Sequence, residues 1–268
     1  MHVPAEKRPV SAEEERIEEK ARSCLNQANA DFLINRGKMN NKYLEALLDK
    51  KQVQEAIEDK RMGRIPYEHY ANIFGDYDPR EIEKNTGIPF LADESGGGTF
   101  DVPLMGQLYR VSWPDGSVEP FDGARPDYKT YVMILRWLQN KKAGKPEDHR
   151  PEALSYKDIP GGNHYYASYE GRVLKRSAFT FAHPQMYPGL EKAAEKLGGG
   201  RSGRGDFSIR FEFLPDIWIT LILWNGDEEF PPDAQILYDS DIGDTFDAED
   251  LAVMGDIFVP RLKELAKE

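Results

Sequence analysis

The sequence predicts an α+β fold in which a mainly antiparallel sheet packs with helices, after a helical N-terminal lead-in. Three observations predict it: helical periodicity fills the start of the chain, strand periodicity is concentrated in runs joined by turn residues, and a helical pattern closes the chain. We expect a helical N-terminal extension over residues 1–62 and a single α+β domain over residues 63–268.

The lead-in is predicted between residues 11 and 61. Ser11 and Glu14 have the spacing of a capping box, and apolar residues then recur near the helical period. Gly63 and Pro66 interrupt this pattern. The extension should therefore end close to Gly63.

Two short helices are expected next, over residues 67–74 and 79–85. Asp78 is the expected N-cap of the second helix, since its side chain can accept a hydrogen bond from the first helical turn. Gly87 is placed to end it, because glycine readily adopts the left-handed conformation of a helix C-terminus.

The first strand signal follows the glycine-rich loop at 95–98. Residues 107–113 alternate between apolar and polar, and the turn residues at 114–117 separate them from Val118. This pattern is typical of a β-hairpin.

Three helices are predicted in the middle of the chain. Asp127 should cap a helix over 128–140, and further helical patterns cover 165–179 and 188–197. An aromatic cluster in this region favours a hydrophobic core, with an aromatic pocket as the alternative; its members are Tyr165, Tyr166, Tyr169, Phe179, Phe181 and Tyr187.

The strongest strand signal lies at residues 207–213, where apolar and polar residues alternate strictly, so that one face is buried. Residues 217–224 are apolar on both faces, which predicts a central strand covered on each side. Residues 235–238 should add a short strand. Asp247 is the expected cap of a closing helix, within which Pro260 should cause a kink or an early end.

Composition excludes several classes of protein. The net charge of -12 repels phosphate backbones, so a nucleic-acid partner is not expected. The sequence contains no apolar run long enough to span a membrane and no signal-peptide pattern at its start. Cys24 is the single cysteine, which suits a reducing compartment, and we expect a cytoplasmic protein.

An acidic run directly after the predicted central strand is the best candidate site. Asp227, Glu228 and Glu229 precede Phe230 and two prolines. Three carboxylates at a strand end can bind a hard cation or shift one another's pKa. The alternative is an ordinary solvated turn, in which acids and prolines are common.

A glycine-rich run at 198–205 contains Arg201 and Arg204 and the letters G-x-G-x-x-G. A dinucleotide-binding fingerprint needs a strand before it and a helix after it, and the predicted order here is the reverse. The run can still bind an anion through backbone amides and the two arginines, and a simple helix-to-strand connection is the alternative.

Other ligand patterns are weak. The five histidines have no metal-binding spacing, and His164 and His183 are the two that deserve inspection as ligands of a metal or tetrapyrrole. Residues 239–250 have the length of a calcium loop, but glycine and aspartate are exchanged at its centre and its last position is aspartate. A helix-entry loop explains this run better. No cofactor follows from the sequence.

The motif W-x-G-D-E-E-F-P at 224–231 resembles that of an uncharacterised family, a domain of unknown function found mostly in anaerobic bacteria and archaea. Similar landmarks occur at 159–162, 197–199, 205–208, 234–240 and 249–251. The family usually has phenylalanine where Tyr238 stands. Some relatives carry an iron–sulfur domain like that of corrinoid proteins, so the resemblance implies a place near corrinoid or one-carbon metabolism. The cysteines of that domain are absent here.

Three hypotheses for function remain open. The first is an accessory or ligand-binding protein whose site has Asp227, Glu228, Glu229 and Phe230 in one loop and the Gly/Arg run at its rim. The second is a metal-assisted enzyme that uses the same acids as ligands or general base. The third is a protein-interaction module whose N-terminal helices dock a partner. Catalytic residues and a bound metal are not assigned.

Overall fold

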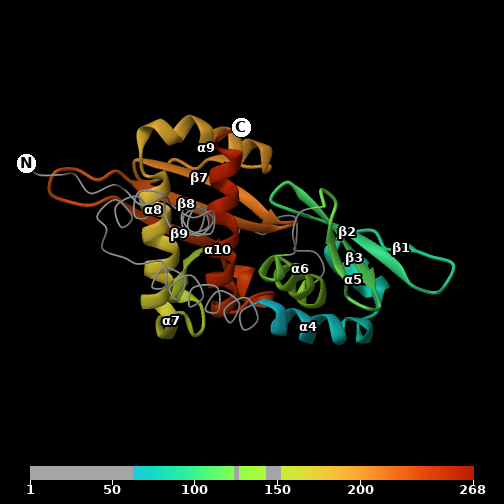
Figure 1. Cartoon of the computed structure of the whole chain (residues 1–268). Helices are drawn as coiled ribbons and strands as arrows, with labels where there is room; N and C mark the ends of the chain where they lie inside the picture. The colour runs from blue at the N-terminus through green and yellow to red at the C-terminus, as the bar shows by residue number, and fades with distance from the viewer. Residues whose placement is uncertain (1–62, 124–126, 143–151) are drawn as a thin grey trace, which may run out of the picture. The chain divides into compact units, whose positions relative to one another are not determined.

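The computed structural model describes residues 63–123, 127–142 and 152–268, and Gly63–Glu268 forms one compact unit by itself (Figure 1). Helices and antiparallel sheets make up the described residues, which confirms the predicted α+β class. The helical lead-in expected over 11–61 and its predicted partner-docking role lie outside the described residues.

Four antiparallel strands form the first sheet, in the order β1-β2-β3-β4. Their bounds are β1 Leu91–Ala92, β2 Gly98–Leu104, β3 Gln107–Trp113 and β4 Val118–Pro120. Met105 and Gly106 join β2 to β3 in a tight turn with φ angles of 45° and 74°, as the twist of a two-residue hairpin requires. The predicted hairpin after residue 107 is confirmed as β3 and β4.

Three helices lie beside this sheet: α4 (Ile65–Asn72), α5 (Pro79–Thr86) and α6 (Tyr128–Asn140). The side chain of Asp78 caps α5, and Gly87 ends it with a φ of 73°. The ring of Tyr131 on α6 packs edge-on against Tyr109 on β3, with 6.3 Å between the ring centroids. The predicted short helices and the helix at 128–140 are therefore confirmed.

The second sheet has five antiparallel strands, in the order β5-β9-β8-β7-β6. Their bounds are β5 Ala153–Ser155, β6 Gly200–Arg201, β7 Phe207–Leu214, β8 Ile217–Trp224 and β9 Asp233–Asp239. The apolar strand β8 occupies the centre, as predicted. Strands β5 and β6 are too short to show a period in the sequence, and they form only because a longer neighbour offers its edge.

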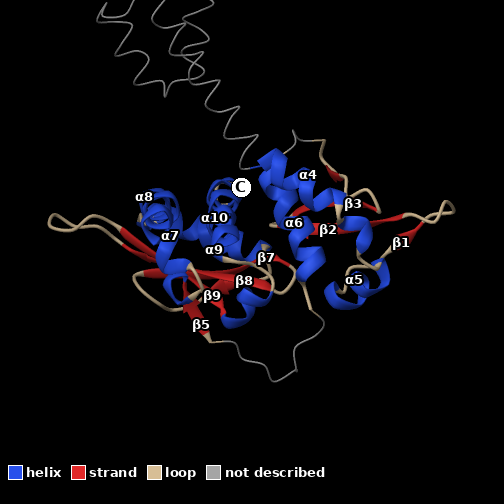
Figure 2. Ribbon diagram, turned by 90° about the horizontal axis from the view of Figure 1, so that it is seen from below, coloured by secondary structure: helices blue, strands red, loops and turns tan. Residues whose placement is uncertain are grey.

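Helices cover one face of the five-stranded sheet, as Figure 2 shows for α8, α9 and α10. The alternate residues of β7 and β8 that face these helices are fully buried, and Phe211 contacts Phe258 of α10 with 5.8 Å between ring centroids. The opposite face is covered less fully than expected, because Trp218 is half-buried and Trp224 is 36% exposed.

The helices of this half are α7 Gly162–Tyr169, α8 Arg176–Phe181, α9 Tyr187–Lys196 and α10 Ala248–Leu265. A π-helical segment, η4 (Glu170–Lys175), separates α7 from α8, where the sequence predicted one helix. Of the two effects predicted for Pro260, a kink or an early end of the closing helix, the early end is wrong: α10 continues past it to Leu265. Buried Phe258 and Leu262 flank the proline, so packing offsets the lost backbone hydrogen bond.

Short 3-10 turns complete the described elements: η2 Phe74–Asp76, η3 Tyr156–Asp158, η5 Pro184–Met186 and η6 Ser240–Asp244. None of the helices in the described part of the chain is both long enough and apolar enough to cross a membrane.

Candidate functional site

The connection between β8 and β9, residues 225–232, carries the predicted acidic site, and we call it the acidic loop. Within it, Oδ1 of Asp227 accepts hydrogen bonds from the backbone N–H groups of Glu229 (2.8 Å) and Phe230 (2.7 Å). The N–H of Asp227 donates to the carbonyl of Phe230 at 2.9 Å. The two bonds that Asp227 accepts hold the pKa of its carboxyl below the ordinary value, so the tip of the loop is a closed turn around a charged carboxylate.

The base of the acidic loop is attached to two neighbouring elements. The N–H of Asn225 donates to Oδ2 of Asp206 at 2.8 Å, and Oδ1 of Asn225 accepts a hydrogen bond from the Tyr187 hydroxyl at the start of α9. The Tyr187 ring stacks on Phe207, with 4.1 Å between centroids. The loop is thus fixed to the connection before β7 and to α9.

Glycine and proline restrict the acidic loop further. A Cβ on Gly226 would lie 2.7 Å from the nitrogen of Pro232 and 3.0 Å from the carbonyl oxygen of Phe230, so only glycine fits there without a shift. Pro231 and Pro232 fix their own φ angles. The sequence G-x-x-x-x-P-P therefore specifies one compact loop.

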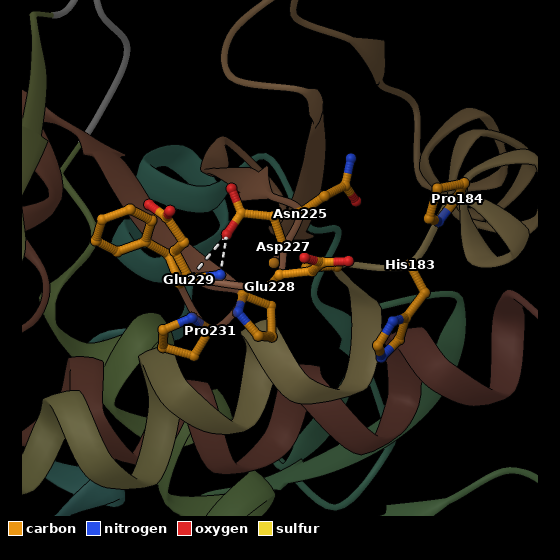
Figure 3. Close-up of a pocket in the computed structure, with 11 residues that line it drawn as sticks. His183, Pro184, Asn225, Asp227, Glu228, Glu229 and Pro231 are labelled. Atoms are coloured by element: carbon orange, nitrogen blue, oxygen red, sulfur yellow. Dashed lines mark hydrogen bonds between the residues drawn. The ribbon is translucent and has the colours of Figure 1, made fainter.

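A cavity of about 530 Å³ lies on one side of this loop (Figure 3). Its lining comes from the residues before α9 and from the loop: Ala182, His183, Pro184, Asn225, Gly226, Asp227, Glu228, Glu229, Phe230, Pro231 and Pro232. Figure 3 shows the Asp227 carboxylate turned back towards its own backbone and the Glu228 carboxylate on the side where His183 lies. Glu228 is thus better placed than Asp227 to meet a ligand.

A second cavity, of about 690 Å³, lies against the same loop. It is lined by Lys175, Phe179, Trp224, Asn225, Phe230, Pro231, Pro232 and Asp233. Three of these side chains are large and exposed: Phe230 (66%), Phe179 (61%) and Trp224 (36%). The two cavities share Asn225, Phe230, Pro231 and Pro232, and we call their combined surface the acid–aromatic groove.

The structure brings together part of the predicted site. Asp227, Glu228, Glu229 and Phe230 all line the groove. Neither Arg201 nor Arg204 belongs to the lining. The guanidinium of Arg201 lies over the Phe207 ring at 4.9 Å, and the backbone N–H of Arg204 donates to the Ser208 hydroxyl at 2.7 Å. Anion binding by these arginines stays a prediction.

One member of the aromatic cluster predicted as core belongs to the groove. Phe179 is exposed and lines the second cavity, which contradicts the favoured hydrophobic-core prediction for this residue and fits the alternative of an aromatic pocket. Lys175 lines the same cavity, and no sequence pattern points to it. Among the other aromatic residues of that cluster, Tyr169 and Phe181 are buried as predicted. No local signal in the sequence separates Phe179 from its buried aromatic neighbours, because its exposure depends on how the helical segment packs against the sheet.

In the part of the chain that the structure describes, neither His164 nor His183, the two histidines considered as ligands, belongs to a group of side chains that could hold a metal ion. His183 lines the first cavity with its Nε2 3.1 Å from the carbonyl oxygen of Phe179, and His164 lies against Tyr165. Across the described residues, no three His, Cys, Asp or Glu side chains are grouped so that they could hold a metal ion. Residues 239–250 run from the last residue of β9 through η6 to the first turn of α10. There the Asp247 side chain accepts from the N–H groups of Glu249 and Asp250, as expected for a helix-entry loop.

Comparison with known proteins places the chain in a family. A family model described as "Domain of unknown function (DUF3786)" matches residues 78–261, which is more than half of the chain. This range includes both sheets and the whole acidic loop. No curated protein and no solved structure matches the chain.

Proposed function

The chain belongs to this family of unknown function, and we propose that it is an accessory or ligand-binding protein whose site is the acid–aromatic groove. One observation carries this proposal: three large aromatic side chains, Phe179, Trp224 and Phe230, are exposed around one cavity that the acidic loop borders. Exposed apolar side chains that gather in one place mark binding surfaces far more often than isolated ones do.

The geometry of the acidic loop supports binding better than catalysis. Asp227 uses one carboxylate oxygen to hold the loop, and its lowered pKa makes it a weak general base, since such a base works best with a pKa near the working pH. In the rival hypothesis, a metal-assisted enzyme that uses Asp227, Glu228 or Glu229 as ligands or general base, the base would therefore be Glu228 or Glu229. This hypothesis predicts a divalent ion in the purified protein and loss of activity in Glu228→Gln.

The link to corrinoid or one-carbon metabolism in anaerobes is the finer part of the proposal, and it rests on the resemblance alone. We also expect the protein to act in the cytoplasm, because its sequence has only Cys24 and suits a reducing compartment. Anaerobic purification, followed by a visible absorption spectrum and elemental analysis of the same sample, tests for a corrinoid, a haem, a flavin and a metal together.

The direct test of the binding site is native mass spectrometry of the full chain after incubation with fractionated cell extract. Phe230→Ala should remove a bound species that the wild type retains. Phe121→Ala is the matched control, because Phe121 is also exposed (51%) but is not part of the groove. A species bound equally by both variants, or no bound species at all, would contradict the proposal.

A further inference from the structure

The acid–aromatic groove is open along its length. Phe230 and Phe179 keep 66% and 61% of their surface in contact with solvent. Pockets for small molecules usually bury most of the ligand and therefore most of their own aromatic walls. Rings this exposed, grouped around one cavity, are typical of a surface that a polypeptide covers.

Exposed large apolar side chains are concentrated in the groove. The described residues include eight large apolar side chains that are exposed, and three of them lie in this groove: Phe179, Trp224 and Phe230. All three line the same cavity of about 690 Å³. This volume leaves space for an additional apolar side chain beside the rings.

Acidic side chains outnumber basic ones in the lining of the groove. Asp227, Glu228 and Glu229 line one cavity and Asp233 the other. Lys175 is the only lysine or arginine in either lining, and its Nζ lies 4.0 Å from a carboxylate oxygen of Glu170, on its own helical segment. An occupant that carries positive charge beside an apolar group complements this surface.

The backbone of the acidic loop is held in one arrangement before anything binds. The turn around Asp227, the hydrogen bond from Asn225 to Asp206 and the two prolines fix the backbone positions from which Glu229 and Phe230 extend. Preorganisation of this kind lowers the entropy cost of association.

We propose that the acid–aromatic groove docks a partner protein through an exposed segment in which a large apolar side chain is flanked by lysine or arginine. The apolar side chain enters the space between Phe179, Trp224 and Phe230, and the basic residues reach Glu228 and Glu229. This inference rests on the proposed function, because it names the class of ligand for the same site.

A library of random short peptides displayed on phage tests the inference with the full chain. The library is first depleted on the double variant Phe179→Ala/Phe230→Ala and then selected on the wild type. Both phenylalanines are exposed, so the double variant should fold. Enriched peptides are synthesised, and their affinities are measured by fluorescence anisotropy at low and high salt.

The expected result is a consensus that places an aromatic or large aliphatic residue next to lysine or arginine. Phe230→Ala should weaken binding of that peptide at least about tenfold, as for a hot-spot residue, while Phe121→Ala leaves it unchanged. The double variant Glu228→Gln/Glu229→Gln should bind more weakly at low salt and lose most of the salt dependence.

Three results would overturn the inference. The first is a consensus without basic residues, and the second is the absence of any peptide that binds the wild type but not the double variant Phe179→Ala/Phe230→Ala. The third is a wild type that is a dimer while Phe230→Ala is a monomer, since a second copy would then occupy the groove. If mass spectrometry nevertheless finds a small molecule whose binding needs Phe230, the proposed function survives and only the partner class is wrong. If neither experiment finds a Phe230-dependent ligand, both fail.

Discussion

Arg136 on α6 donates a hydrogen bond from Nη1 to Oδ1 of Asp250 at 2.7 Å, and this pair joins the middle of one helix to the first turn of another. The Asp250 side chain is 7% exposed, and its other oxygen accepts from the N–H of Asp247. Burial raises the pKa of Asp250 to about 7, although Arg136 acts in the opposite direction. The pair therefore connects the two helices, and its contribution to the free energy of unfolding depends on pH.

The first prediction concerns the variant Asp250→Asn. In the folded wild type the pKa of Asp250 is about 7, above its ordinary value of 3.8, so the folded state holds the proton more tightly than the unfolded state. The free energy of unfolding should therefore fall as pH rises through this window, by at most about 1.4 kcal/mol per pH unit. The free energy of unfolding of Asp250→Asn should not show this fall, because asparagine does not titrate.

Urea unfolding of both proteins between about pH 4.5 and 7.5 measures the difference. The nearby acids Asp247 and Glu249 are retained in the variant, so their contribution is common to both proteins. A wild type that gains stability over Asp250→Asn as pH rises would contradict the prediction, because attraction to Arg136 would then outweigh burial.

The second prediction concerns two buried tyrosines. The hydroxyl oxygens of Tyr169 on α7 and Tyr238 on β9 are 3.0 Å apart, and each residue is 1% exposed. Burial raises the pKa of both, so both are neutral hydrogen-bonding groups. Replacing either with phenylalanine leaves the other hydroxyl unpaired in the core, at a cost of about 1–3 kcal/mol.

The double variant Tyr169→Phe/Tyr238→Phe should cost clearly less than the sum of the two single changes, because no unpaired hydroxyl remains. Urea unfolding of the four proteins gives the coupling energy. Costs that add to within about 0.5 kcal/mol would show that the two hydroxyls are not coupled.

The third prediction concerns the turn around Asp227. Its Oδ1 accepts from the N–H groups of Glu229 and Phe230, so Asp227→Ala should speed hydrogen exchange at these two amides. Protection in the wild type should be greatest at neutral pH and should decline as pH falls through the lowered pKa of Asp227. Exchange can be followed by NMR, with Glu228→Ala as the control that keeps the turn. Unchanged protection in Asp227→Ala would indicate that the prolines alone hold the loop.

Local signals explain what could be predicted from the sequence. The helix at 128–140 and the strand at 107–113 have the predicted ends, because a cap at Asp127 and an alternating pattern are properties of neighbouring residues. The same holds for the acidic loop, whose carboxylates, glycine and prolines are adjacent in the chain. Strand β6 could not be predicted in this way, because its two residues form a strand only through pairing with β7.

The rest of the candidate site depends on tertiary packing. Phe179 on α8 and Lys175 at the end of η4 reach the acidic loop because both segments pack against the sheet that carries it. Their own neighbourhood is rich in aromatic residues that are indeed buried, such as Phe181, so the local pattern gave no reason to separate Phe179 from them. A single exposed position on a helix can be recognised only once the surface it faces is known.

The last prediction concerns two glycines with opposite surroundings. A Cβ on Gly255, inside α10, would lie 2.5 Å from both methyl carbons of Val173 in η4, whereas a Cβ on Gly171 would meet nothing within 4 Å. Alanine favours a helix over glycine by about 1 kcal/mol. At Gly255 this gain is smaller than the cost of forcing the two helical segments apart, about 1–3 kcal/mol, so Gly255→Ala should lower stability.

Gly171→Ala is the matched control, and it should raise stability by up to about 1 kcal/mol, because the same gain in backbone propensity meets no steric cost. Urea unfolding of both variants against the wild type gives the two signs. A stabilised Gly255→Ala would mean that Val173 moves aside at little cost, and the close packing of α10 on η4 would then not limit the choice of residue at this position.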